Sequence, residues 1–237
     1  MNSKYDQRAR TSIYETIRGR IENLYYEPGS ELSIAELTQD LGVSRSPVRD
    51  ALLRLERDKL IDIYPQRGTW VAKLDVENIM QERFLRLSVE ENVFRKCIDA
   101  VLEDEERKIR FSSRLRANLV QQKACLSLND IRTFLDLDVE FHRMFYIEIG
   151  FERIYKIVEA HTGNERRIRI LNNMNQAAAQ AVYEEHLAMT DAIDSEDSGR
   201  ALEILAHHFS KLKDEVDELV RLHPSYFTDE SKRKEKE

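Results

Sequence analysis

Four side chains of metal-binding types interrupt apolar helical stripes in the C-terminal part of this 237-residue chain. Asp138 and His142 lie one helical turn apart on one stripe, and His186 and His208 each occupy a core position of a later stripe. A single core histidine is usually only a hydrogen-bonded residue. Three neutral imidazoles and one carboxylate, however, satisfy a divalent cation such as Zn²⁺, Ni²⁺ or Mn²⁺, and a buried carboxylate without a partner is costly. The pattern therefore predicts a site for a divalent transition metal at Asp138, His142, His186 and His208.

The elements that must bring these side chains together are helices. From Asp75 onward the chain has almost no strand pattern and no proline until Pro224. Helix bundles build metal sites from facing helices and leave coordination positions for water or a ligand. We expect an all-α antiparallel bundle of about six helices. They are predicted over residues 76–101, 104–126, 130–149, 152–174, 176–194 and 197–222.

A second chemical feature is the basic and polar start of a helix predicted within residues 44–60. Gly42 can end the preceding helix, Ser44 can cap the next one, and Pro47 falls in its first turn. In a helix-turn-helix protein this end of the second helix contacts DNA, and arginine suits guanine edges and phosphates. The DNA contacts predicted here are Arg45, Ser46 and Arg49.

The segments around this helix complete a DNA-binding domain. An amphipathic helix is predicted over residues 12–25, and a capping box at residues 33–36 begins a short helix before Gly42. Alternation over residues 61–64 and a return strand from residue 69 predict a β-hairpin wing. Its tip residues, Arg67 and Gly68, could reach a phosphate or the minor groove. The fold class is thus mainly α: a winged helix-turn-helix of three helices and a hairpin, followed by the bundle.

The motif LGVSRSPVRDALLRLE followed by PQRGTWV resembles the winged helix-turn-helix of the GntR family of bacterial transcription regulators, over about residues 10–73. By analogy with that pattern, Arg45, Ser46, Arg49, Arg67 and Gly68 would touch DNA. Lys59 departs from the family, which commonly has glycine there.

Residues 75–222 resemble the FCD effector domain of the FadR branch of that family. Its spacing of Asp and His four apart, then a Glu-His pair, then a final His is met by Asp138-His142, Glu185-His186 and His208. The resemblance implies that this set binds metal, with a small carboxylate often completing the coordination shell. Phe151 departs from the branch, which commonly has Asn after the glycine.

Three further residues are candidates for effector binding. Arg86 and Glu90 match the branch's Arg-x-x-φ-Glu pattern, in which φ is apolar; they form either an intrahelical ion pair or a pocket group in which Arg86 holds a carboxylate. His161 and Asn164 interrupt the apolar line of the predicted helix 152–174. They are candidate pocket-wall groups, and either could equally be a hydrogen-bonded core residue.

Composition and charge agree with a soluble two-domain protein. Residues 1–74 contain 12 Lys and Arg against 11 Asp and Glu, a net charge of +1, so the total of −7 leaves −8 for residues 75–237. No apolar run approaches the ~20 residues of a membrane span, so we expect no membrane partner and a cytoplasmic location. The predicted division is a DNA-binding domain at 1–74, an effector and dimerisation domain at 75–227, and a charged disordered tail at 228–237.

Three functions are compatible with these features. The first is a homodimeric regulator that reads an inverted repeat of operator DNA and responds to a small organic acid at the metal, with apolar effector-domain helix faces forming the interface. The second is a metalloregulator in which the metal itself is the signal. The third is a hydrolytic metalloenzyme. It is disfavoured because Glu185 points about 100° away from His186 on the helix and cannot serve as an obvious general base. We therefore expect no enzymatic activity.

Overall fold

The computed structural model describes residues 13–173, 176–210 and 212–229. The chain forms two compact units. The first comprises Met1–Met80, Gly163–Arg167 and Glu218–Glu237, and the second comprises Gln81–Thr162 and Ile168–Asp217. The first unit therefore contains more than the predicted domain at 1–74. Of the predicted tail, only Thr228 and Asp229 fall within the described residues.

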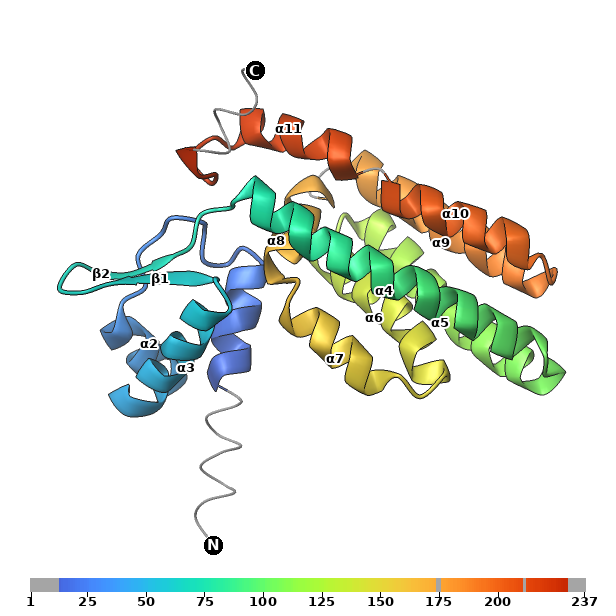
Figure 1. Cartoon of the computed structure of the whole chain (residues 1–237), viewed down its shortest axis with the longest axis horizontal. Coiled ribbons are helices and arrows are strands. Elements are labelled where there is room, and N and C mark those ends of the chain that lie inside the picture. The colour runs from blue at the N-terminus through green and yellow to red at the C-terminus, as the bar shows by residue number, and fades with distance from the viewer. Residues whose placement is uncertain (1–12, 174–175, 211, 230–237) are drawn as a thin grey trace, which may run out of the picture. The chain divides into compact units, whose positions relative to one another are not determined.

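The first unit contains the predicted winged helix-turn-helix (Figure 1). A helix at residues 13–22 is followed by α2 (Ile34–Leu41) and α3 (Arg45–Arg57). The wing consists of β1 (Ile61–Tyr64) and β2 (Gly68–Val71), which pair antiparallel from Ile61 with Val71 to Tyr64 with Gly68. The sequence prediction of three helices and a hairpin is confirmed.

Local signals position α2 and α3. Ser33 caps α2 by accepting a hydrogen bond from the Glu36 amide, and Gly42 ends it in the left-handed conformation, with φ of 64°. Because the apolar side of α3 is buried, its polar side faces outward. The buried residues of α3 are Val48, Ala51, Leu52 and Leu55.

A hydrogen-bond network fixes the C-terminal end of α3. The Tyr14 hydroxyl donates to the carboxylate of Asp58, and Arg18 donates to the Tyr14 hydroxyl at 2.8 Å. Burial, together with the hydrogen bond to Asp58, raises the pKa of Tyr14 to about 12, so the phenol stays protonated as a donor. This network holds α3 against the helix at residues 13–22.

The second unit is helical throughout its described part. It includes α5 (Glu105–Leu128), α6 (Ile131–Glu148), α7 (Glu152–Ala160), α9 (Gln176–Asp194) and α10 (Ser198–Ser210). The remaining helices, α4 (Val76–Leu102), α8 (Gly163–Asn173) and α11 (Leu212–Leu222), each contribute residues to both units. Helix α5 packs against both α6 and α9, and α9 packs against α10 (Figure 1). None of the helices in the described ranges is both long and apolar enough to cross a membrane.

The structure divides two predicted helices more finely. The stretch 152–174 forms α7 and α8 instead of one helix, because the chain turns at His161 and Thr162. The Thr162 hydroxyl donates to the carbonyl of Val158 at 2.9 Å, which satisfies one of the last carbonyls of α7. The stretch 197–222 is described as α10 and α11. The other four predicted helices begin and end within two residues of α4, α5, α6 and α9.

Candidate functional site

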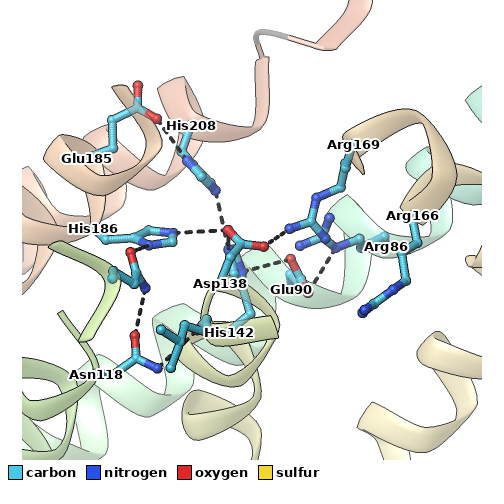
Figure 2. Close-up of polar contacts among 12 residues, drawn as sticks. Arg86, Glu90, Asn118, Asp138, His142, Arg166, Arg169, Glu185, His186 and His208 are labelled. Carbon is cyan, nitrogen blue, oxygen red and sulfur yellow. Dashed lines mark hydrogen bonds and ion pairs between the residues drawn. The ribbon is translucent and has the colours of Figure 1, made fainter. Parts of the chain in front are cut away.

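The four predicted metal ligands meet in the second unit. Asp138 and His142 come from α6, His186 from α9 and His208 from α10. One ligand atom of each lies within 4.8 Å of the ligand atoms of the others. Their side chains point toward one another (Figure 2), and Asp138, His142 and His186 are buried, with His208 nearly so.

The spacing of these atoms fits a single cation. The Nε2 atoms of His142 and His208 are 3.3 Å apart. Oδ1 of Asp138 lies 3.8 Å from Nε2 of His142 and 3.7 Å from Nε2 of His186. In a tetrahedral site with metal–ligand bonds of about 2.0–2.1 Å, neighbouring ligand atoms are about 3.3 Å apart. These three pairs are near that value and all four ligand atoms lie within 4.8 Å of one another, so the cluster would close around a bound ion.

Each imidazole also has a hydrogen-bond acceptor near its Nδ1 atom. His208 pairs with Glu185 at 2.8 Å and His186 with Gln122 at 3.2 Å, both within hydrogen-bond distance. Nδ1 of His142 lies 3.4 Å from Oε2 of Glu90, an ion-pair distance at which neither atom has a hydrogen-bond partner among the described residues. Such partners favour the tautomer protonated at Nδ1, which directs the lone pair of Nε2 at the metal. The lone pairs of His142 and His208 then face each other, and Nε2 of His186 has no hydrogen-bond partner among the described residues. A cation at the centre would satisfy all three nitrogens.

The electrostatics of the cluster keep the ligands in their metal-binding forms. Burial lowers the pKa of His142, and burial together with the His208 ring lowers that of His186 well below its usual value. Both rings are therefore neutral at neutral pH, as metal binding requires. Burial alone would raise the pKa of Asp138, but the Arg169 guanidinium and then the nearby imidazoles hold it below its usual range. The carboxylate is ionised.

Two arginines lie close to the cluster. Arg169 of α8 donates from Nη2 to Oδ2 of Asp138. Arg86 of α4 pairs through Nε with Glu90 at 3.1 Å, and both side chains are buried. Although burial alone would raise the pKa of Glu90, Arg86 and then His142 lower it to about 2. Arg86 therefore reaches the cluster through Glu90, whereas Arg169 contacts a predicted metal ligand directly.

His161 and Asn164 are not among the residues that meet at the cluster, and their role as pocket-wall groups stays a prediction. His161 is exposed at the C-terminal end of α7. Asn164 belongs to the first unit, where its side-chain oxygen accepts a hydrogen bond from Arg167. The apolar line that they interrupt in the sequence is divided between α7 and α8, so these residues do not share one helix face.

Sequence reasoning missed two residues of the site, Gln122 and Arg169. Gln122 is fully buried on the inner face of α5, and its side-chain nitrogen donates to the side-chain oxygen of Asn118 at 2.6 Å. Two buried amides on one helix face were a usable signal. Arg169 had no such signal in the sequence, because its contact with Asp138 depends on where α8 begins.

The role of Gln122 is testable by Gln122→Leu. Leucine fills the volume but accepts no hydrogen bond from Nδ1 of His186, so the ring loses its tautomer and orientation. We expect metal affinity to fall by about 10-fold to 100-fold. Competition with a chelator measures it, and Gln121→Leu, at an exposed neighbouring position, is the matched control. Equal metal affinities for the two variants would contradict this role.

The predicted DNA contacts lie exposed on the first unit. Arg45, Ser46 and Arg49 occupy the first turns of α3, with their side chains outside the core. Arg67 and Gly68 lie at the tip of the wing, also exposed. Gly68 has φ of 111°, a backbone conformation that a side chain would strain. Both sets are accessible to a nucleic acid.

Comparison with known families assigns both parts of the chain. Residues 9–71 match the family described as bacterial regulatory proteins, gntR family, and residues 84–211 match the FCD domain. The second match alone covers more than half of the chain.

Individual relatives agree. The chain is 24% identical over 218 residues to the HTH-type transcriptional repressor RspR of Escherichia coli (strain K12), covering 92% of this chain and 93% of that protein. It is 26% identical over 227 residues to the gluconate operon transcriptional repressor of Bacillus subtilis (strain 168), covering 92% and 89%. The fold is similar to that of E. coli McbR/YncC, with a TM-score of 0.74, 15% identity and coverage of 91% and 98% of the two chains. A putative transcriptional regulator GntR from Rhodococcus sp. RHA1 has a TM-score of 0.71 at 20% identity, with coverage of 89% and 97%.

Proposed function

Because the chain belongs to the GntR family of bacterial transcription regulators and contains an FCD domain, we propose that a metabolite controls its binding to operator DNA. The metabolite is a small carboxylate, and it binds at a divalent metal in the second unit. The observation that supports this proposal best is the convergence of Asp138, His142, His186 and His208. The protein would act in the cytoplasm as a homodimer.

The DNA-binding half of the proposal rests on α3 and the wing. Arg45, Ser46 and Arg49 would contact base edges and phosphates, and Arg67 and Gly68 would contact the backbone or the minor groove. Two copies of α3 spaced about one DNA turn would read an inverted repeat. Three large apolar residues exposed on α5, Ile109, Val120 and Leu128, would supply apolar contacts for a subunit interface.

The sensing half rests on the donor set. Three imidazole nitrogens and one carboxylate oxygen suit Zn²⁺, Ni²⁺ or Mn²⁺. When bound, the cation would supply a Lewis acid that accepts an oxygen atom of the effector. Glu90, Gln122 and Glu185 would keep the three rings in position.

Coupling requires that the effector bind the DNA-competent and incompetent states with different affinity. Three helices, α4, α8 and α11, continue from one unit into the other. In α8, Gly163–Arg167 belong to the first unit, while Arg169 contacts Asp138 in the second. A change at Asp138 would thus act on a helix that belongs to both units.

A second candidate is a metalloregulator, in which the ion alone is the signal. The cluster favours it as well, because four protein ligands already satisfy a tetrahedral ion without an organic ligand. We do not propose the hydrolytic enzyme. Glu185, the carboxylate considered as its base, accepts a hydrogen bond from His208 in the favoured tautomer. The relatives described above are transcription regulators.

The proposal is tested in two steps. Metal-depleted protein is first screened for thermal shifts with divalent ions, and the metal-loaded protein is then screened with small carboxylic acids. A ligand at 100 times its dissociation constant adds about 2.7 kcal/mol to the stability of the native state. The DNA that the protein selects from random sequence is then titrated with and without the acid. A shift by metal but by no acid, with DNA binding that responds to metal, would establish the metalloregulator instead.

A further inference from the structure

Arg169 contacts the metal cluster from α8. Its Nη2 donates to Oδ2 of Asp138, which is 1% exposed, while the Arg169 side chain is 16% exposed. In Figure 2 the guanidinium approaches Asp138 from the side opposite His186. Oδ1 is the atom that faces the imidazoles. The contact with Arg169 therefore uses Oδ2 of Asp138, and Oδ1 is available to bind a metal. The guanidinium would lie next to that metal.

The charges around this place do not balance once a divalent ion is bound. Asp138 contributes −1, Glu185, which faces Nδ1 of His208 at 2.8 Å, contributes another −1, and the neutral imidazoles contribute nothing, so these groups balance an ion of charge +2. Arg169 then leaves one positive charge in excess, whereas Arg86 and Glu90 offset each other. Excess charge in a buried site is costly unless it is paired. A small anion beside both the metal and Arg169 would offset it.

We propose that Arg169 binds the carboxylate effector, holding one carboxylate oxygen while the metal holds the other. This inference rests on the function proposed above and identifies the protein group that selects an anion. A guanidinium has five N–H donors in a fixed fork that matches a carboxylate, and the contact with Asp138 engages one of its nitrogens. The ligand class is a small carboxylic acid with one carboxylate at the metal.

Arg86, the arginine predicted from sequence, is less suited to this role. Its Nε lies 3.1 Å from Oε1 of Glu90, and its side chain is 8% exposed, half the value for Arg169. Its guanidinium carbon lies 5.8 Å from the centroid of the Phe209 ring. Arg86 neutralises Glu90, which in turn faces His142. Arg86 therefore influences His142 through Glu90.

The test compares Arg169→Gln and Arg169→Lys with Arg86→Lys. Zn²⁺ affinity is measured in carboxylate-free buffer by competition with a chelator, and affinities of the Zn²⁺-loaded protein for acetate, succinate and citrate by calorimetry. We expect Arg169→Gln to weaken carboxylate binding by about 10-fold to 100-fold, because a charged hydrogen-bond pair is lost. The same change should strengthen Zn²⁺ binding several-fold, because a nearby positive charge is removed. Arg169→Lys, which keeps the charge, should fall between wild type and Arg169→Gln in both measurements.

The opposite signs separate this role from simple damage to the fold, which would weaken both ligands. Co²⁺-loaded protein gives a second readout: acetate should change its visible absorption in the wild type, but not in Arg169→Gln. Unchanged carboxylate affinity in Arg169→Gln, or a loss seen only in Arg86→Lys, would overturn the inference while leaving the sensor intact. Failure of the wild type to bind Zn²⁺, or to bind any carboxylate once loaded, would overturn the inference together with the proposed sensor.

Discussion

Replacing His186 by alanine is expected to abolish tight metal binding. His186 is fully buried, its ring stacks on Phe141 with centroids 4.0 Å apart, and Gln122 holds its Nδ1 atom. An imidazole nitrogen held this firmly loses little conformational freedom when it binds an ion. Its removal should therefore lower the metal affinity more than replacing a residue that only hydrogen-bonds to a ligand. We expect metal affinity to fall by more than the ~100-fold upper range for second-sphere changes. Chelator competition measures the affinity directly.

The control for this experiment is His207→Ala. His207 precedes His208 on α10, but its side chain is 65% exposed and lies 3.6 Å from Glu185 at the edge of the cluster. Its removal should leave metal affinity close to that of the wild type. Because alanine at 186 also opens a space in the core, the quantity compared is the shift in melting temperature on adding metal. Undiminished metal binding by His186→Ala would show that the ion binds elsewhere.

The inward direction of the four candidate ligands could be predicted because a helix has a fixed period. A polar residue such as His186 that recurs in register with apolar neighbours must face the core, whatever the rest of the fold does. Which side chains of other helices face His186 depends on how the helices pack, and local sequence patterns do not predict this packing. The contacts of Gln122 with His186 and of Arg169 with Asp138 therefore came only from the structure.

The same distinction applies to the division of the chain. The winged helix-turn-helix could be predicted because its caps, turn and hairpin are local signals. The sequence could not predict that Gly163–Arg167 belong to the first unit, because this depends on long-range packing. A Cβ atom on Gly163 would lie 2.8 Å from a side-chain oxygen of Glu22, and the fully buried Arg167 donates to the carbonyl of Ala72 at 2.8 Å. Neither contact can be predicted from the periodicity of the sequence.

Replacing Arg49 by alanine should abolish sequence-specific DNA binding and leave metal binding unchanged. Arg49 is exposed in the first turns of α3, and its neighbour Val48 is fully buried, which fixes the helix beneath it. A bidentate arginine contact with a base is worth about 1–3 kcal/mol. A dimer has two such contacts, so we expect a loss of about 2–6 kcal/mol on an inverted repeat. Fluorescence anisotropy at fixed salt measures it.

The variant Arg57→Ala is a control that distinguishes the loss of a base contact from the loss of a positive charge on α3. Arg57 is also an exposed arginine, at the other end of α3, so its loss removes the same charge from the same helix. If binding depends on the position of the side chain, Arg57→Ala should weaken operator and unrelated DNA only slightly and to the same extent. Arg49→Ala should reduce operator binding to the level of unrelated DNA. Equal losses from the two variants would mean that α3 contributes only charge, and that the base contacts must be sought on the wing at Arg67.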